Sequence, residues 1–207
     1  MKTNGMTAII LAAGLSSRMG KFKALLPWRG MPLIQYQLEQ MQRAGMEKII
    51  VVLGHQANQL EQIIAKYDVK TVINEQYPQG KSTSIRKGIA HIPNDTKGIL
   101  ISAVDQPVPS PTLGKVIDHL SITKAPAIIP VYQGKSGHPI LFHSNLKADL
   151  LAVNEETKGL RQVIQKHYSQ IEYLDVSDPS VLLNFNKPSD YSKNCLQGGS
   201  VIERFKD

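Results

Sequence analysis

The stretch TAIILAAGLSSRMGKFKALLPW occupies residues 7–28. Its first five residues are mostly apolar and of strand length. Small residues, a glycine and the cations Arg18, Lys21 and Lys23 follow. Small residues let backbone N–H groups approach an anion closely, and the cations can neutralise a triphosphate. The stretch therefore predicts a strand followed by a phosphate-binding loop. A surface loop with solvated cations is an equally good interpretation at this point.

Apolar runs of strand length recur along the chain, and segments of helical period separate them. They lie at residues 7–11, 48–53, 69–73, 98–102 and 127–131. Because these runs are apolar on both faces, they predict an α/β fold with a mostly parallel twisted sheet and helices on both faces. The chain shows no repeat, low-complexity tract or linker, so we expect residues 1–207 to form one domain.

Proline, glycine and serine mark the ends of further elements. Pro32 and Gly45 bracket one predicted helix, and Ser110 begins another. The remaining elements are expected as a small β-hairpin insertion with its loop at 132–139, a short strand at 140–142, helices at 145–152 and 159–167, and a strand at 171–176.

The composition narrows the class of protein. Cys195 is the single cysteine, so an intramolecular disulfide is excluded, and the apolar run that ends at Gly14 is too short for a signal peptide or a membrane span. We expect a cytoplasmic protein without a membrane partner. The net charge of +7 comes from dispersed basic residues, and aromatic residues make up only 6%. This combination favours a phosphorylated small molecule over nucleic acid.

Residues 80–82, Gly-Lys-Ser, resemble the end of a P-loop. Glu75 stands where that motif needs its first glycine, so the motif is absent. Gly80, Ser82 and Ser84 nevertheless begin a predicted helix at the edge of the sheet where ligands bind. We expect their hydroxyls and N–H groups to face a nucleotide.

Asp105 follows the apolar run that begins at residue 98 and precedes Gln106 and Pro107. A carboxylate at the end of a strand can hold Mg²⁺ against phosphate oxygens, because Mg²⁺ takes few protein ligands. The residue type alone fits a helix cap or a turn equally well. Its position after the strand favours the metal.

Five motifs in sequence order resemble the MobA-like NTP transferase family, and most closely the molybdenum cofactor cytidylyltransferases. They are LAAGLSSRMG at residues 11–20, the lysine at 23, LLPW at 25–28, DQP at 105–107 and GHP at 137–139. The first motif is highly specific for nucleotidyltransferases, and the match covers nearly the whole chain. The resemblance implies a Rossmann-like nucleotidyltransferase fold.

The resemblance also implies roles for individual residues. The nucleotide-binding loop would be Leu11, Ala12, Ala13 and Gly14, with Arg18 and Lys23 on the triphosphate. Asp105 would bind Mg²⁺, and the second ligand would come from a late strand ending near Asn186. Many cytidylyltransferases have aspartate at that position, whereas guanylyltransferases often have asparagine, and Asn184 is an alternative ligand.

The expected reaction is transfer of CMP from CTP to the molybdopterin cofactor. Within the family, LAAG accompanies CTP and LAGG accompanies GTP, so Ala13 favours CTP. Gly137, His138 and Pro139 would contact the acceptor, although a loop histidine shaped by its neighbours is an equal alternative. Such enzymes would also touch a molybdoenzyme or its chaperone transiently. The open alternatives are GTP use, a sugar phosphate acceptor and a non-catalytic nucleotide-binding protein.

Overall fold

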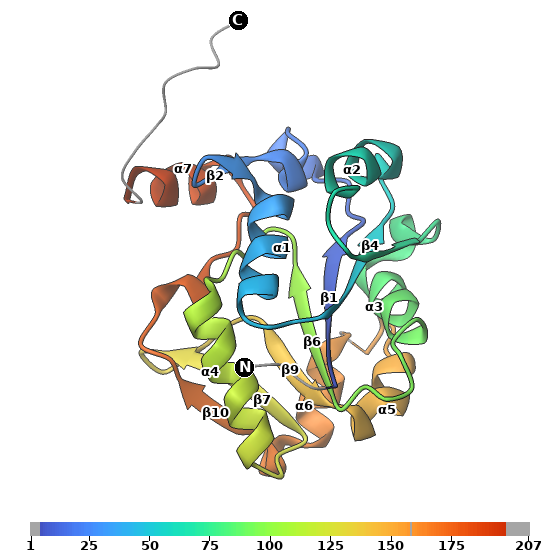
Figure 1. The fold of residues 1–207 in the computed structure, drawn as a ribbon, viewed down its shortest axis with the longest axis vertical. Coiled ribbons are helices and arrows are strands. Elements are labelled where there is room, and N and C mark those ends of the chain that lie inside the picture. The colour runs from blue at the N-terminus through green and yellow to red at the C-terminus, as the bar shows by residue number, and fades with distance from the viewer. Residues whose placement is uncertain (1–4, 158, 198–207) are drawn as a thin grey trace, which may run out of the picture.

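An eight-stranded mixed sheet forms the centre of the protein (Figure 1). The structure is a computed structural model that describes residues 5–157 and 159–197. The strand order is β10-β7-β9-β6-β1-β4-β5, and β8 pairs with β7. The strands are β1 (Met6–Ala12), β4 (Lys48–Leu53), β5 (Lys70–Ile73), β6 (Gly98–Ala103), β7 (Ala127–Tyr132), β8 (Lys135–Ser136), β9 (Ile140–His143) and β10 (Glu172–Asp175).

The first predicted strand lies in the middle of this sheet. β1 pairs in parallel with both β4 and β6, and Ile9 lies opposite Ile50 and Ile101. All seven residues of β1 are buried, as a strand covered on both faces requires. The predicted α/β class and the mostly parallel sheet are confirmed.

One region of the sheet runs in the opposite direction. β9 is antiparallel to both β6 and β7, which lie on either side of it. The chain reaches β9 through the β7–β8 hairpin, whose two turn residues Gln133 and Gly134 have φ of 49° and 75°. Positive φ at both positions matches the twist of a two-residue hairpin, so the predicted hairpin insertion is confirmed.

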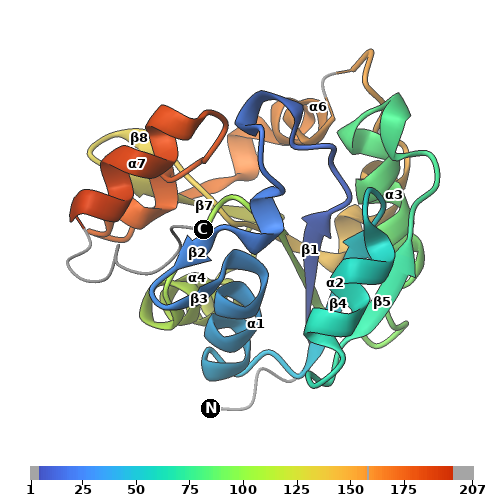
Figure 2. The ribbon, with the colours of Figure 1, turned by 90° about the horizontal axis from the view of Figure 1, so that it is seen from above.

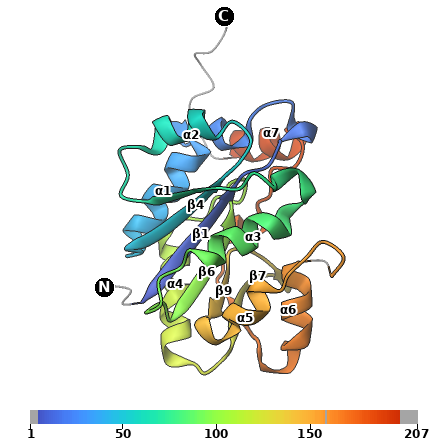
Figure 3. The ribbon, with the colours of Figure 1, turned by 90° about the vertical axis from the view of Figure 1, so that its right-hand side faces the viewer.

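Helices cover both faces of the sheet (Figures 1 and 3). One face carries α1 (Leu33–Arg43), α2 (Ala57–Ile64) and α4 (Ser110–Ile122), and the other carries α3 (Lys81–Ala90), α5 (Lys147–Leu151) and α6 (Leu160–Lys166). The alternation of β1 separates the two cores, because Ile10 joins the first and Ile9 the second.

A third, smaller core joins the two ends of the described chain. The hairpin of β2 (Pro27–Trp28) and β3 (Met31–Pro32) lies beside α7 (Pro188–Gln197), as Figure 2 shows from above. Phe185 is fully buried there, with its ring centroid 5.1 Å from that of Trp28. The hydroxyl of Tyr191 donates to the carbonyl of Pro27.

Two predicted boundaries are corrected. Pro32 does not begin the first helix but ends β3, because it pairs with Pro27, and the helix starts at Leu33. Asn184 and Asn186 lie in a loop before α7, not at the end of a late strand. Within residues 5–157 and 159–197, no helix is long and apolar enough to cross a membrane.

Candidate active site

A cavity of about 340 Å³ opens at the carboxyl ends of β1 and β6. The predicted residues in its wall are Leu11, Ala12, Ala13, Gly14, Arg18, Lys23, Gly80, Ser84, Asp105, Asn186 and the alternative ligand Asn184. Five predicted residues do not line it: Lys21, Ser82, Gly137, His138 and Pro139. Most of the expected nucleotide site is thus assembled from four segments of the chain.

Hydrogen bonds fix the loop that follows β1 and lines the cavity. The Ala13 carbonyl accepts a hydrogen bond from the N–H of His55 at 3.0 Å, and the Ser16 hydroxyl oxygen accepts one from the N–H of Lys23 at 3.1 Å. A Cβ on Gly14 would meet nothing within 4 Å, so open space lies beside this glycine. Lys21 is exposed and does not line the cavity, unlike Arg18.

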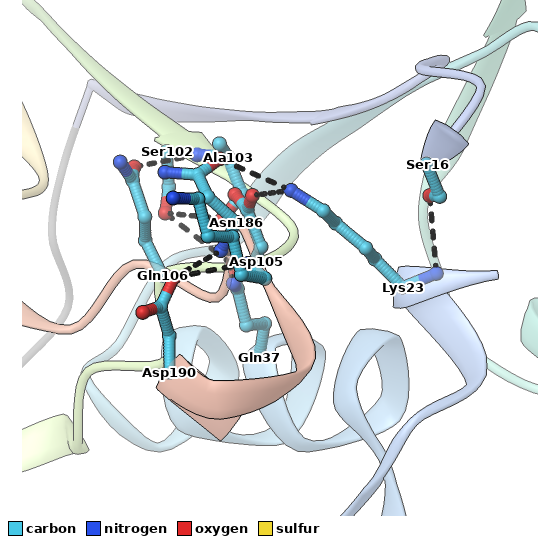
Figure 4. A network of polar contacts seen from close by, with 10 residues as sticks. Ser16, Lys23, Gln37, Ser102, Ala103, Asp105, Gln106, Asn186 and Asp190 are labelled. Carbon is cyan, nitrogen blue, oxygen red and sulfur yellow. Dashed lines mark hydrogen bonds and ion pairs between the residues drawn. The ribbon is translucent and has the colours of Figure 1, made fainter. Parts of the chain in front are cut away.

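An ion pair between two residues lies in the cavity wall (Figure 4). The Lys23 Nζ lies 2.6 Å from Asp105 Oδ2 and 3.2 Å from Asn186 Oδ1. The side chains of Lys23 and Asp105 are only 13% and 12% exposed. Asp105 is not a helix cap, because α4 begins five residues later and has no side-chain cap. Its carboxylate is instead directed at the ligand-binding edge.

The loop that carries Asn186 is fixed by its backbone. The N–H of Phe185 donates to the Asp105 carbonyl at 3.1 Å. The Asp190 carboxylate accepts the N–H groups of Asn186 at 3.2 Å and of Lys187 at 2.9 Å. These bonds and the burial of Phe185 hold the Asn186 side chain against Lys23.

The oxygens of Asp105 and Asn186 form a donor set that suits Mg²⁺. Both contact one cation, the Lys23 ammonium, and one is a carboxylate while the other is an amide carbonyl. Within the described residues, no group of three His, Cys, Asp or Glu side chains could hold a metal. A site with one carboxylate fits Mg²⁺, which completes its shell with water and substrate phosphate.

The start of α3 differs from the expectation at Ser82. Both the N–H and the hydroxyl of Ser82 donate to Glu155 Oε1, at 2.6 and 2.7 Å. These hydrogen bonds hold the pKa of Glu155 below its usual range. Ser82 therefore faces a protein carboxylate rather than a nucleotide. Gly80, with φ of 119°, leaves the room that Glu155 needs, because a Cβ there would lie 2.4 Å from Glu155 Cδ.

Lys81 is a cavity residue that the sequence reasoning missed. It is exposed and lines the cavity beside Gly80. Desolvation by the surrounding wall lowers the pKa of Lys81, with Lys23 acting in the same direction and Asp105 opposing it. Lys81 is the first residue of a helix at the ligand-binding edge of the sheet, and this position could have indicated a role in the site. The absence of a P-loop motif drew attention away from this lysine.

The predicted acceptor loop lies close to this cavity without lining it. A Cβ on Gly137 would lie 2.6 Å from the Val181 carbonyl oxygen, so this position has no room for a side chain. Burial lowers the pKa of His138 to about 4, and the charge of Lys81 adds to the shift while Asp105 opposes it. His138 is thus a neutral imidazole within electrostatic range of the cavity. Its contact with an acceptor stays a prediction.

The sequence matches a protein family and is similar to individual known proteins. Residues 8–171 match the MobA-like NTP transferase domain. The molybdenum cofactor cytidylyltransferase of Escherichia coli is 28% identical over 91% of this chain and 94% of its own. The nicotine blue oxidoreductase of Paenarthrobacter nicotinovorans is also 28% identical, over 84% of this chain and 89% of its own.

Solved structures share the fold. A nucleotidyl transferase from Methanothermobacter thermautotroptrophicus is 26% identical, with a TM-score of 0.80 over 95% of this chain and 100% of its own. Rv0371c of Mycobacterium tuberculosis in complex with manganese is 25% identical, with a TM-score of 0.76 over 91% of this chain and 96% of its own.

Proposed function

Because this chain belongs to the MobA-like NTP transferase family, we propose that it transfers CMP from CTP to the molybdopterin cofactor and releases pyrophosphate. The family makes it a nucleotidyltransferase. The observation that carries the site assignment is the convergence of Lys23, Asp105 and Asn186 on the wall of the cavity formed by the loop after β1. The similarity to a molybdenum cofactor cytidylyltransferase over 91% of the chain supports this acceptor.

The proposed reaction needs no general base. A phosphate oxygen of the acceptor, already an anion, forms a bond to the α-phosphorus of CTP. The bond from that phosphorus to the bridging oxygen of the β-phosphate breaks, and the electron pair leaves with pyrophosphate. Positioning and neutralisation of charge supply the catalysis. Arg18 and Lys23 are the cavity cations assigned to the triphosphate.

Asp105 and Asn186 would hold Mg²⁺ in this proposal. The metal, when bound, would neutralise charge on the phosphate oxygens. The structurally similar Mycobacterium tuberculosis protein in complex with manganese supports a divalent cation in this fold. Asn186 would contribute an amide oxygen without charge, so Asp105 is the only anionic ligand assigned to the metal.

Ala13 supports CTP over GTP. It is buried in the cavity wall, and a Cβ on Gly54 would lie only 2.8 Å from the Ala13 Cβ. The Ala13 methyl group therefore packs against Gly54, and we infer CTP use from the LAAG motif that carries this alanine. Transfer of GMP from GTP, a sugar phosphate acceptor and a non-catalytic nucleotide-binding protein are the alternatives.

Pyrophosphate release tests the proposal. We expect the protein to consume CTP with Mg²⁺ only when molybdopterin cofactor is added, and not with sugar 1-phosphates. Asp105→Ala should lower the rate roughly 10²- to 10³-fold with the fold intact, whereas Lys21→Met, outside the cavity, should retain wild-type turnover. Wild-type turnover in Asp105→Ala would refute the metal site. Turnover with GTP alone, or with a sugar phosphate alone, would select the corresponding alternative.

A further inference from the structure

Asn74 lies behind the cavity wall with its amide orientation fixed. It follows β5 and is 3% exposed. The N–H of Gln76 donates to Asn74 Oδ1 at 3.1 Å, which identifies the oxygen end of the amide. The Nδ2 group then donates its two hydrogens to Thr83 Oγ1 and Ser84 Oγ, both at 2.9 Å. Asn74 is thus a proton donor to two neighbouring hydroxyls.

The two hydroxyls use their own protons differently. Thr83 Oγ1 donates to the Gly80 carbonyl at 2.8 Å, so its proton stays inside the protein. Ser84 is 5% exposed and lines the cavity, and no acceptor for its hydroxyl proton is found in residues 5–157 and 159–197. Because Asn74 already donates to the Ser84 oxygen, the proton is the group that Ser84 offers to the cavity.

The packing of α3 places Ser84 beside β1 and β4. Ser84 lies one turn before Gly88 on the same helix face. A Cβ on Gly88 would lie 2.7 Å from an Ile9 side-chain atom and 3.1 Å from one of Val52. One turn toward the start of α3, Ser84 therefore faces the carboxyl ends of these two strands.

Apolar groups line the cavity at the ends of these two strands, and Lys81 lies one turn before Ser84 at the start of α3. The apolar groups include Leu11, Ala13 and Tyr77, and a Cβ on Gly54 would lie 2.8 Å from both the Ala13 methyl carbon and the Tyr77 ring. An aromatic ring and small apolar groups suit a nucleobase, whereas a triphosphate needs the cations elsewhere in the cavity.

We propose that Asn74 is a positioning residue that fixes the Ser84 hydroxyl as a hydrogen-bond donor to an acceptor atom of the nucleobase. That atom is a carbonyl oxygen or an unprotonated ring nitrogen. The inference rests on the proposed nucleotide-binding function and adds the direction of one base contact.

Three variants test whether Ser84 donates a hydrogen bond to the base and whether Asn74 fixes that orientation. Ser84→Ala removes the donor. Asn74→Asp has nearly the same shape, but its carboxylate accepts hydrogen bonds, so the Thr83 and Ser84 hydroxyls turn their protons toward it and away from the cavity. CTP affinity is measured by calorimetry with Mg²⁺ and no acceptor, and tripolyphosphate serves as a probe without a base. We expect each single variant to lose about 5- to 100-fold in CTP affinity.

The double variant separates positioning from a general effect of the new charge. Asn74→Asp should weaken CTP binding no further in a Ser84→Ala background, and Ser84→Ala should bind tripolyphosphate as the wild type does. A full Asn74→Asp loss in that background would overturn the role of Asn74. Equal losses of CTP and tripolyphosphate in Ser84→Ala would place the contact on phosphate, and no loss of either would remove the contact. If the wild type bound neither ligand, the proposed nucleotide-binding function itself would fail.

Discussion

Removing Lys23 alone should destabilise the protein more than removing both members of its pair with Asp105. In Lys23→Met the Asp105 carboxylate, 12% exposed, keeps its place without its cation. Breaking a buried pair costs about 3 to 5 kcal/mol, and contact with the open cavity lowers our expectation to about 3 kcal/mol. For a chain of this length, that loss corresponds to a fall in Tm of about 6 to 12 °C.

Two matching variants should cost less stability than Lys23→Met. Asp105→Asn leaves an ammonium on a long side chain that can turn to solvent, so we expect a loss of only about 1 kcal/mol. The double variant Lys23→Met/Asp105→Asn has no unpaired charge and should also lose about 1 kcal/mol.

Urea unfolding and pyrophosphate release together test this reasoning. Stability should return in the double variant while turnover stays about 10²- to 10³-fold below that of the wild type, because the double variant lacks both charges of the site. A double variant that is less stable than Lys23→Met would refute the idea that unpaired charge causes the loss. Recovered turnover would refute the catalytic assignment.

Two further predictions concern the cavity rim. Gly80→Ala should lose about 1 to 3 kcal/mol of stability in urea, because φ of 119° disfavours alanine and the new Cβ would displace Glu155; an unchanged midpoint would contradict this. His138 has a pKa of about 4 when folded against 6.5 ordinarily, so the unfolded chain binds the proton first as pH falls. The wild type should therefore lose stability from about pH 6.5 toward pH 4, by at most about 1.4 kcal/mol per pH unit, and His138→Gln should lose less; parallel profiles would exclude His138 as the cause.

The parts of the fold that the sequence predicts best are those with a strong apolar pattern. β1, β4 and β6 are buried on both faces, so each is a continuous apolar run. The hairpin loop expected at residues 132–139 implied that β9 runs opposite to β7, as it does, but the place of β9 between β7 and β6 could not be predicted, because a short apolar segment does not encode its neighbours. The β2–β3 hairpin was missed since each strand has only two residues.

Prediction of the site follows the same division. Lys23 and Asp105 lie 82 residues apart in sequence, yet both follow strands whose carboxyl ends share an edge, so the general rule brings them together. The Ser82 hydroxyl points to Glu155, which lies in a loop 73 residues away in sequence and contacts the start of α3. No local pattern specifies such a contact, and residue type alone could not separate Ser82 from Ser84.

The contact between Lys23 and Asn186 spans 163 residues, and the small core around Phe185 connects the same two regions. During synthesis on a ribosome, Asn186 is added 163 residues after Lys23, so the two loops emerge far apart in time. The nascent protein should therefore stay unable to bind nucleotide until residue 186 has left the exit tunnel. Contacts of such long sequence separation also slow folding.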